Sequence, residues 1–598
     1  MPTIAEKGEI QVLNKYQFEV LKLSLDSDQL TQRDIARSCD VSVGSVNKAI
    51  KSLKDAGCLT DAGKVTNTGL KELEPYKVDN AIILAAGVAT RMAPLSFEKP
   101  KALFEVNGEV LIERLIRQLH EADINNIIIV VGHMKESFFY LSAKFGVQLV
   151  VNPEYASKNN YASIWHAKEY LGNSYILPTD QYYERNPFQK YVFEPYCAAV
   201  ESPQGTTVRA LICDDKNYIV GFDMKPGYFM RGPAYFDRHF SKSFLEIINK
   251  EKDLPETFQK WWHVIFLEHA KELRMRMIKW DNSDVFEFDR MQDLVQFDSD
   301  FLINVDSKIL DNICSTLDCA RSDISDVKPL KEGLTNLSVL FSCKGEKYVY
   351  RHPGLGSNEI VNREAETFSL NVAKELGLDD TFVFEDPKTG WKISRFIEGC
   401  VPFDYANTKH VKKALSMVKT LHECDRVSPW TFDFYAEGLK LVQLLNDMGY
   451  HLPPDFDKLL PTVSTLSEMM QSDMDKKVLC HNDFYGPNLL VRGDEMWLID
   501  WEYSAMGDWA CDIGNFVAQG SGFSIEETID ALSLYFGRDA SQIEIRHCIA
   551  AVGVVGWYWY VWAIYKEAMG NSVGEWMLTW YNAAELYSST ALDMYREK

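Results

Sequence analysis

The sequence predicts a multidomain chain, in which a small α+β module precedes an α/β domain and a larger α+β domain with two lobes. Three observations predict it. Two helix patterns and a strand pair lie near the start, four apolar runs alternate with helical stretches in the middle, and a strand-rich segment precedes a helix-rich remainder. A length of 598 residues leaves room for about four domains.

Residues 1–76 form the first predicted module. "TQRDIARSCD" and "VSVGSVNKAIKSLKDAG" read as two helices, and "CLTDAGKVTNTGLKEL" reads as two short strands around Gly63 and a closing helix. The pattern resembles a winged helix-turn-helix domain. Lys48, Lys51 and Lys54 on the second helix suit a groove-reading helix. However, residues 1–78 hold eleven basic and eleven acidic residues, so DNA binding and a role in dimerisation or contact with the neighbouring domain both stay open.

Residues 79–305 form the second predicted domain. "NAIILAAG", "NNIIIVVG", "VQLVVN" and "NSYILPTD" are short apolar runs, and helical stretches such as "LIERLIRQLHEA" lie between them. Apolar strands that alternate with helices predict a parallel, Rossmann-like sheet covered on both faces. Ligands of such sheets bind at the carboxyl ends of the strands.

The loop "ILAAGVATRMAPLSFEKPKAL" directly follows the first of these strands. The small residues Ala85, Ala86 and Gly87 let the backbone approach a ligand closely, and their N–H groups suit phosphate oxygens or a base edge. Arg91 and Lys101 bring positive charge to the same loop. This combination is more specific than a glycine-rich turn alone.

The loop resembles the nucleotidyltransferase family that includes sugar-phosphate nucleotidylyltransferases and phosphocholine cytidylyltransferases. Gly87, Arg91 and Lys101 match the family pattern, whereas Ala89 stands where the family usually has a second glycine. The resemblance implies a further set of nucleotide and Mg²⁺ contacts. These are Asn160 and Ser163 for the nucleotide, and Asp180, Glu287 and Asp289 for the metal. A strand-end carboxylate that merely caps a helix is the alternative for Asp180 and for the later pair.

The implied reaction is the attack of a phosphomonoester oxygen on the α-phosphorus of a nucleotide. Both reactants are anions, so Mg²⁺, Arg91 and Lys101 would offset their repulsion and stabilise the departing pyrophosphate. A phosphate dianion is already a nucleophile and needs no general base.

Residues 306–598 form the third predicted domain. "HNDFYGPNLL" and "LIDWE" within it resemble the phosphotransferase loop of choline and aminoglycoside kinases, which share the bilobal protein-kinase-like fold. The resemblance implies that Asp483 is the catalytic residue that accepts or orients the proton of the attacking hydroxyl, and that Asn488 and Asp500 hold Mg²⁺. His481 is expected to support the loop rather than to react.

Other parts of this kinase pattern follow in order. The hairpin "LKEGLTNLSVLF" places Gly333, Thr335 and Asn336 over the nucleotide. Arg351 stands at the position of the family's basic phosphate-binding residue, and Glu366 (or Glu364) is expected to orient it.

Aromatic residues after the phosphotransferase loop suggest the substrate. Quaternary ammonium groups bind aromatic faces by cation–π attraction, whereas an aminoglycoside site would be lined by acids. The candidates for choline binding are Trp501, Glu502, Trp557, Tyr560 and Trp562 here, and Trp261 and Trp262 in the second domain. Ordinary core packing is the alternative for each aromatic residue.

A kinase that makes phosphocholine and a cytidylyltransferase that consumes it fit together. The sequence therefore predicts a bifunctional enzyme that makes CDP-choline from choline, ATP and CTP, with phosphocholine as intermediate and Mg²⁺ as cofactor. The resemblance implies that CDP-choline supplies phosphocholine for surface glycans. Ethanolamine or a sugar phosphate as substrate, and a DNA-binding regulator that senses these ligands, are the alternatives. The sequence leaves open whether the chain forms a homo-oligomer.

Bulk composition narrows the setting. The net charge of −23 argues against broad nucleic-acid binding by the whole chain. The 12 cysteines show no CxxC pair, which favours reduced thiols in the cytoplasm over a disulfide framework or a zinc site. Residues 548–565 are uncharged, but their two glycines and central Trp and Tyr residues favour a buried helix over a membrane span.

Overall fold

A computed structural model gives the fold and describes residues 13–26, 31–38, 41–330, 336–353, 361–520, 522–570 and 572–596. The chain forms two compact units, Met1–Lys308 and Ile309–Lys598. The first unit contains both the predicted N-terminal module and the predicted α/β domain. Each unit is described by itself.

The N-terminal module has the three helices that its sequence predicts and a further helix, α1, but a single bridge takes the place of the two predicted strands. Its helices are α1 (Lys15–Asp26), α2 (Gln32–Ser38), α3 (Val43–Asp55) and α4 (Asn67–Leu73), and Leu59 and Val65 form an isolated antiparallel bridge. Ser42 caps α3 by accepting a hydrogen bond from the Ser45 N–H. Lys48 and Lys51 are exposed on α3.

The module packs against the α/β domain through aromatic rings. The ring centroids of Tyr76 and Phe193 are 5.5 Å apart in a stacked arrangement, and Phe18 of α1 contacts both rings. Lys22 Nζ donates a hydrogen bond of 2.7 Å to Gln189 Oε1. The two parts of the first unit therefore share a hydrophobic core.

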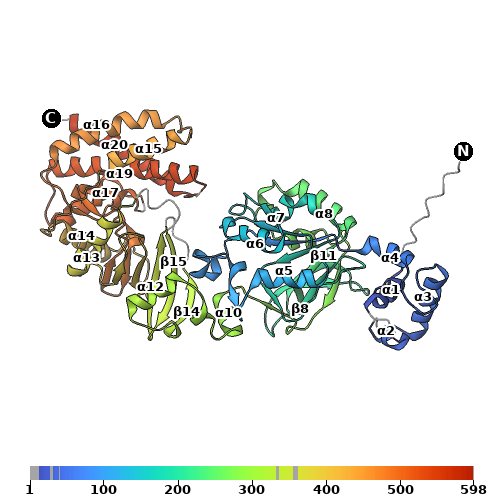
Figure 1. The fold of residues 1–598 in the computed structure, drawn as a ribbon. Coiled ribbons are helices and arrows are strands. Elements are labelled where there is room, and N and C mark those ends of the chain that lie inside the picture. Colours follow the sequence, from blue (N-terminus) through green and yellow to red (C-terminus); the bar gives the residue numbers. More distant parts are fainter. Residues whose placement is uncertain are drawn as a thin grey trace. The chain divides into compact units, whose positions relative to one another are not determined.

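The α/β domain is built on a seven-stranded sheet with the order β12-β8-β11-β6-β1-β4-β5. Two of its strands, β8 and β11, are labelled in Figure 1. Its strands are β1 (Asn80–Ala85), β4 (Ile127–Val131), β5 (Gln148–Val151), β6 (Ser174–Pro178), β8 (Tyr196–Glu201), β11 (Tyr228–Phe236) and β12 (Arg276–Lys279). The four apolar runs that predict a parallel sheet are β1, β4, β5 and β6, and they pair in parallel. The whole sheet is mixed, because β11 runs antiparallel to both β6 and β8.

Helices cover both faces of this sheet, as expected from its apolar strands. Side chains alternate between faces along a strand, so Ile83 lies in one core cluster and Ile82 in the other. Residues of α5 and α6 belong to the first cluster, and residues of α7, α8 and α9 to the second. These helices are α5 (Leu111–Glu121), α6 (Phe139–Phe145), α7 (Tyr161–His166), α8 (Arg238–Glu251) and α9 (Trp262–Glu268).

The remaining elements of the first unit are short or peripheral. They are β2 (Glu105–Val106), β3 (Glu109–Val110), β7 (Gln181–Tyr183), β9 (Val208–Cys213), β10 (Ile219–Lys225), β13 (Val285–Glu287), α10 (Met291–Phe297) and α11 (Phe301–Asn304). β7 pairs with β13, and this pairing brings residues 285–287 beside the carboxyl end of β6.

The second unit has the predicted small β lobe and larger helical lobe. The β lobe is a five-stranded antiparallel sheet with the order β14-β15-β16-β18-β17. Its elements are α12 (Lys308–Leu317), β14 (Ile324–Pro329), β15 (Asn336–Cys343), β16 (Glu346–Pro353), α13 (Arg363–Glu375), β17 (Phe382–Glu385) and β18 (Lys392–Arg395).

The helical lobe surrounds the long helix α19 (Gln542–Ala568). Its other elements are α14 (Thr408–His422), α15 (Phe434–Asp447), α16 (Phe456–Asp473), β19 (Val478–Cys480), β20 (Leu489–Arg492), β21 (Glu495–Leu498), β22 (Ala505–Gly507), α17 (Trp509–Ala518), α18 (Ile525–Phe536) and α20 (Trp576–Arg596). In the part of the chain that the structure describes, α19 is the one helix apolar and long enough to cross a membrane, and its apolar window is entirely buried. It packs against α15, α16, α17 and α20, as the buried-helix expectation requires.

Two glycines let α20 lie close to α19. A Cβ atom at Gly553 would lie 2.5 Å from Ser588 Oγ, and one at Gly556 would lie 2.9 Å from the Ala584 nitrogen. Any larger side chain there would push the helices apart.

Candidate functional sites in the two units

The first candidate site is a cavity of about 350 Å³ at the carboxyl ends of β1 and β6. This is where ligands bind to sheets of this kind. Most of the residues singled out from the sequence of the α/β domain line it. They are Ala85, Ala86, Gly87, Arg91, Lys101, Asn160, Ser163, Asp180, Trp261 and Asp289. Further wall residues were missed, among them Tyr155, Lys158, Asn159 and Gln259, although the first three lie in the polar segment that follows β5.

The loop after β1 forms one wall of the cavity. A Cβ atom at Gly87 would meet no atom within 4 Å, so the backbone there is open to a ligand. Ala89 adopts left-handed backbone torsions, with φ of 53°. That conformation suits the glycine expected at this position and is unfavourable for alanine.

Opposite charges meet in pairs on the cavity wall. Lys101 Nζ lies 3.1 Å from Asp180 Oδ2, and Arg91 Nη1 lies 3.2 Å from Asp289 Oδ2. The other oxygen of Asp180, Oδ1, is buried and accepts no hydrogen bond within the described residues. A buried carboxylate oxygen without a partner is costly unless it binds a cation. Asp180 and Asp289 therefore fit Mg²⁺.

Glu287 lies next to these acids but outside the cavity wall. Arg231 Nε donates a 3.0 Å hydrogen bond to its Oε2, and Gln181 Nε2 donates one of 3.3 Å to its Oε1. Burial and the nearby Asp180 carboxylate raise the pKa of Glu287. Asp289 and Glu287 thus differ in their exposure to a ligand.

The two neighbouring tryptophans of the α/β domain have different surroundings. Trp261 is 42% exposed and lines the cavity. Trp262 is buried in the core, with ring contacts to Phe236 and Phe244. The expectation that both rings face choline is therefore corrected for Trp262, because consecutive residues at a helix start point in different directions.

Asn160 and Ser163 are held by hydrogen bonds. Asn160 Oδ1 accepts from the Trp262 N–H at 2.8 Å, and Ser163 Oγ accepts from Asn152 Nδ2 at 3.0 Å. The first bond caps the start of α9, and the second joins α7 to the end of β5. Both side chains are therefore fixed beside the cavity before any ligand binds.

The second candidate site surrounds Asp483, which follows β19. Asn488 Nδ2 donates to Asp483 Oδ2 at 2.8 Å, and Gln519 Nε2 donates to Asp483 Oδ1 at 3.0 Å. Burial, together with the charges of Asp500 and Glu502, raises the pKa of the Asp483 carboxyl to about 8. A carboxyl in this range suits proton transfer near neutral pH.

A buried arginine joins the acids of this site. Arg351 on β16 lies 2.5 Å from Asp500 Oδ1 and 3.7 Å from Glu502 Oε2. It also pairs with Glu366 of α13, which is fully buried. The predicted Arg351–Glu366 pair is thus present. Lys392, 3.2 Å from Glu366, is a second buried cation that sequence reasoning missed.

Asn488 and Asp500 offer oxygen ligands to a metal ion. Both hydrogen bonds from the Asn488 side chain use its nitrogen, to Asp483, so its amide oxygen takes no part in them. The Asp500 side chain is 34% exposed. A carboxylate and an amide oxygen are ligands that Mg²⁺ accepts. The predicted residues Gly333 and Thr335, and the side chain of Asn336, lie outside the described residues.

Asp512 of α17 holds the loop that contains Asp483. Its carboxylate accepts hydrogen bonds from the backbone N–H groups of His481 and Asn482, at 2.8 and 2.6 Å, and contacts His422 Nε2 at 2.9 Å. The His481 ring is fully buried, and its Nε2 bonds the Ile499 carbonyl at 3.1 Å. His481 therefore supports the loop, as expected from the sequence.

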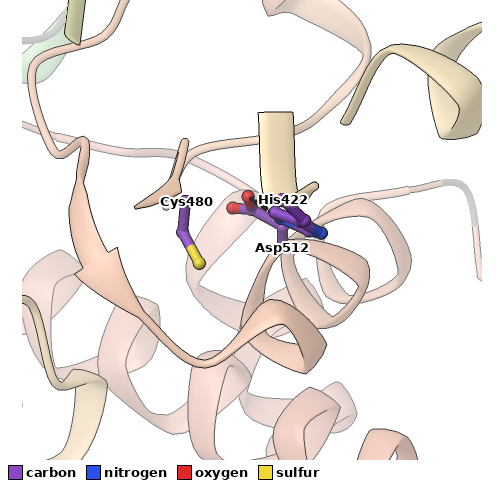
Figure 2. Close-up of side chains that lie close together, drawn as sticks. All are labelled: His422, Cys480 and Asp512. Atoms are coloured by element: carbon purple, nitrogen blue, oxygen red, sulfur yellow. Dashed lines mark hydrogen bonds and ion pairs between the residues drawn. The ribbon is translucent and has the colours of Figure 1, made fainter. Parts of the chain in front are cut away.

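Figure 2 shows that His422, Cys480 and Asp512 lie close together, with their potential ligand atoms within 4.8 Å of one another. A metal ion does not fit this group well. The Asp512 oxygens already accept the three hydrogen bonds described above, and His422 Nδ1 contacts the Tyr535 hydroxyl at 2.9 Å. Burial raises the pKa of the Cys480 thiol well above its usual range, so the thiol stays protonated.

Three of the predicted choline-binding aromatics lie in the core. Trp501 is fully buried and donates a hydrogen bond to the Leu498 carbonyl. Trp557 packs against Tyr435 and Phe456, and Tyr560 against Tyr581. Residues 557 and 560 occupy a different side of α19 from residues 559 and 562, so the rings of Trp557 and Tyr560 contact other neighbours than the ring of Trp562 does.

An aromatic group that includes Trp562 lies on the other side of α19. The Trp559 ring lies 5.5 Å from the rings of Tyr503 and Trp562, measured between centroids. Lys566 Nζ lies 5.1 Å from the centre of the Trp562 ring. Tyr503, Trp559 and Trp562 are called the aromatic group below. Tyr503 and Trp559 were missed, although Trp559 and Trp562 have the i, i+3 spacing of one helix face.

Comparisons with known proteins match each part of the chain. A family model described as MobA-like NTP transferase domain matches residues 81–207. The phosphotransferase enzyme family model matches residues 326–542, and a model described as winged helix-turn-helix DNA-binding matches residues 13–60.

Individual relatives cover either the middle or the end of the chain. Choline-phosphate cytidylyltransferase of Streptococcus pneumoniae is 35% identical over 215 residues, which are 36% of this chain and 94% of that protein. 2-Aminoethylphosphonate cytidylyltransferase of Lancefieldella rimae is 31% identical over 233 residues, which are 37% of this chain and 93% of that protein. Protein LicA of Haemophilus influenzae is 25% identical over 267 residues, which are 42% of this chain and 97% of that protein.

Proposed function

Because the chain belongs to the nucleotidyltransferase family of choline-phosphate cytidylyltransferase, and joins to it a phosphotransferase domain and a winged helix-turn-helix domain, we propose that it makes CDP-choline from choline, ATP and CTP. One observation supports this above all. Two separate centres that pair acids with cations, around Asp180 and around Asp483, lie in two compact units of one chain. The product of the second unit is a substrate of the first.

The first reaction phosphorylates choline in the second unit. The choline hydroxyl oxygen bonds to the γ-phosphorus of ATP, the bond from that phosphorus to the β–γ bridging oxygen breaks, and ADP leaves. Asp483 takes the hydroxyl proton, and its two amide partners hold the carboxylate in place. Arg351 brings positive charge to the phosphates from a buried position.

The second reaction transfers CMP in the first unit. A phosphate oxygen of phosphocholine bonds to the α-phosphorus of CTP, and pyrophosphate leaves with the electrons of the broken bond. Lys101 and Arg91 stabilise the negative charge, and the open backbone at Gly87 donates N–H groups to phosphate oxygens. Mg²⁺ on Asp180 and Asp289, and on Asn488 and Asp500 in the other unit, would neutralise phosphate charge.

The aromatic group favours choline among amino alcohols. A trimethylammonium group cannot donate hydrogen bonds, but it binds aromatic faces, with a gain of about 2 kcal/mol when desolvated. The position of Lys566 Nζ, 5.1 Å from the centre of the Trp562 ring, supports cation binding by this group. Ethanolamine would need acceptors, and the buried acid Glu502 already lies 3.7 Å from Arg351. Ethanolamine, 2-aminoethylphosphonate and a sugar phosphate are therefore the control substrates. The proposal places both reactions in the cytoplasm, with surface glycans as the destination of the phosphocholine.

A second candidate function is DNA binding by the N-terminal module. The exposed Lys48 and Lys51 on α3 favour it, since the second helix of such modules reads the major groove. The Lys48→Glu/Lys51→Glu double variant should weaken binding to a DNA duplex at least about 10-fold at low salt. The Lys71→Glu variant, on exposed α4, is the control. Equal binding by wild type and double variant would contradict this candidate function.

Two variants test the assignment of the reactions to the units. Asp483→Asn should slow choline phosphorylation by about 100-fold or more and leave CMP transfer to added phosphocholine unchanged. Asp180→Asn should do the reverse. Loss of both reactions in either variant, in protein with wild-type thermal unfolding, would contradict the assignment.

A further inference from the structure

Gln519 makes a direct contact with the reacting carboxylate of the kinase site. Its Nε2 donates 3.0 Å to Asp483 Oδ1, on the side opposite to the Asn488 contact with Oδ2. Gln519 is 4% exposed, and it directly follows the last residue of α17. In the reaction described above, Gln519 is one of the two amides that hold the Asp483 carboxylate in place.

Gln519 is in turn fixed by Asn515, one helical turn earlier. Gln519 Nε2 lies 3.2 Å from Asn515 Oδ1, so its two N–H groups point to Asp483 and Asn515. Asn515 is fully buried, and its Nδ2 donates 2.9 Å to the Cys511 carbonyl. Turning the Gln519 amide around would place its oxygen against a carboxylate. The hydrogen-bond partners therefore specify one orientation for each amide.

The same Asn515 oxygen reaches the aromatic group. Trp559 Nε1 donates 2.7 Å to Asn515 Oδ1, and the edge of the Trp559 ring meets Tyr503 at an interplanar angle of 89°. A continuous line of hydrogen bonds thus runs from Asp483 through Gln519 and Asn515 to the indole of Trp559.

We propose that Gln519 is a positioning residue, which together with Asn515 fixes the separation between the Asp483 carboxylate and the aromatic group. This separation makes the kinase selective for amino alcohols with two carbons between the hydroxyl and the quaternary nitrogen. The inference rests on the proposed function, since it takes choline as the substrate of this site. It gives a physical reason for the preferred substrate length. The hydroxyl end of choline meets Asp483 and the ammonium end meets the aromatic group, and the hydrogen bonds through Gln519 and Asn515 join these two groups.

The chemistry explains why an amide suits this place. Asp500 and Glu502 already surround Asp483 with negative charge, so a glutamate at position 519 would add repulsion where glutamine donates a hydrogen bond. An aliphatic side chain would leave Asp483 Oδ1 and Asn515 Oδ1 without the donor that joins them.

The test compares choline with its homologue that has one more methylene between oxygen and nitrogen. Trp559→Phe keeps an aromatic face but removes the N–H donor to Asn515 together with part of the ring system. It should lower the preference in kcat/KM for choline over the homologue by about 10-fold. Gln519→Met should lower kcat for choline by about 10- to 100-fold and leave the KM for ATP unchanged.

Trp557→Phe is the matched control. It makes the same change on the same helix, and the buried Trp557 Nε1 has no hydrogen-bond partner within the described chain. Its preference for choline should equal that of wild type. Gln519→Glu keeps the size of the side chain and should lower kcat for choline at least as much as Gln519→Met.

The two hypotheses fail in different ways. If the wild type phosphorylates neither choline nor its homologue, the proposed function and the inference both fall. If the wild type is active but Trp559→Phe keeps the full preference, the inference alone is overturned. A rise in the KM for ATP equal to the fall in kcat would show general damage and would also overturn it.

Discussion

Lys101 Nζ lies 3.1 Å from Asp180 Oδ2, while Asp180 Oδ1 is buried and accepts no hydrogen bond in the described part of the chain. One oxygen of this carboxylate thus binds the lysine expected to contact phosphate, and the other remains as a ligand for a cation. A similar relationship exists in the second unit, where Arg351 contacts Asp500. In both sites, a cationic side chain that is expected to bind phosphate contacts a carboxylate that is expected to bind Mg²⁺.

The lysine should compete with a metal ion for Asp180 when nucleotide is absent. Lys101→Met should therefore tighten Mn²⁺ binding to the nucleotide-free first unit, measured by electron paramagnetic resonance, while it slows CMP transfer by about 100-fold or more. Lys99→Met is a control two residues earlier in the chain. Weaker Mn²⁺ binding in Lys101→Met would contradict the described role of the pair.

Replacing Ala89 by glycine should stabilise the first unit. Left-handed torsions cost a non-glycine residue roughly 1–2 kcal/mol, and the greater freedom of glycine in the unfolded chain offsets part of the gain. We expect Ala89→Gly to raise the midpoint of thermal unfolding slightly and to retain CMP transfer. Ala162→Gly, inside α7, should instead lower the midpoint. A lower midpoint in Ala89→Gly would show that the alanine conformation is not strained.

Substitutions at two residues on different sides of α19 should distinguish an effect on substrate binding from an effect on core packing. Trp562→Leu should raise the KM for choline by about 10-fold or more, and should raise the KM for ethanolamine less, because it removes a cation–π contact. Tyr560→Leu also removes a buried ring, but on another side of the helix, and should leave both KM values unchanged. Equal effects of the two variants would assign the choline site elsewhere.

The contacts of Glu544 at the start of α19 should make the free energy of unfolding of the second unit vary with pH in the acidic range. A hydrogen bond from Arg538 is the main reason that the pKa of Glu544 falls to about 2, and bonds from Ser541 lower it further against the opposing effect of burial. This stabilisation is complete above the ordinary pKa of a glutamate and is lost as pH falls toward 2. Glu544→Gln should lower stability at pH 7 by about 1 kcal/mol and flatten its decline below pH 5, measured by urea unfolding. An unchanged decline would contradict this role.

The elements with strong local patterns were predictable from the sequence. The runs that became β1, β4, β5 and β6 consist mostly of apolar residues, which is the pattern of a sheet covered on both faces. The antiparallel direction of β11 was not predictable in this way, because burial on both faces looks the same for either strand direction.

Candidate residues within short motifs could also be singled out from the sequence, whereas those that join a site from distant segments could not. The loop after β1 and the Asp483 loop each gather their residues within a short segment, residues 85–101 and 483–500. Lys392, Asp512 and Gln519 reach the kinase site from other elements, and no local spacing marks them. Aromatic content alone does not say which side of a helix faces a site.

The most direct test follows phosphorus atoms through both reactions. The protein is incubated with choline, Mg²⁺, unlabelled CTP and ATP that carries a label in its γ-phosphoryl group, and the products are separated and weighed by mass spectrometry. The account predicts labelled CDP-choline, with the label in the phosphoryl group next to choline, formed without added phosphocholine. Unlabelled CDP-choline, or labelled phosphocholine that never becomes CDP-choline, would contradict it.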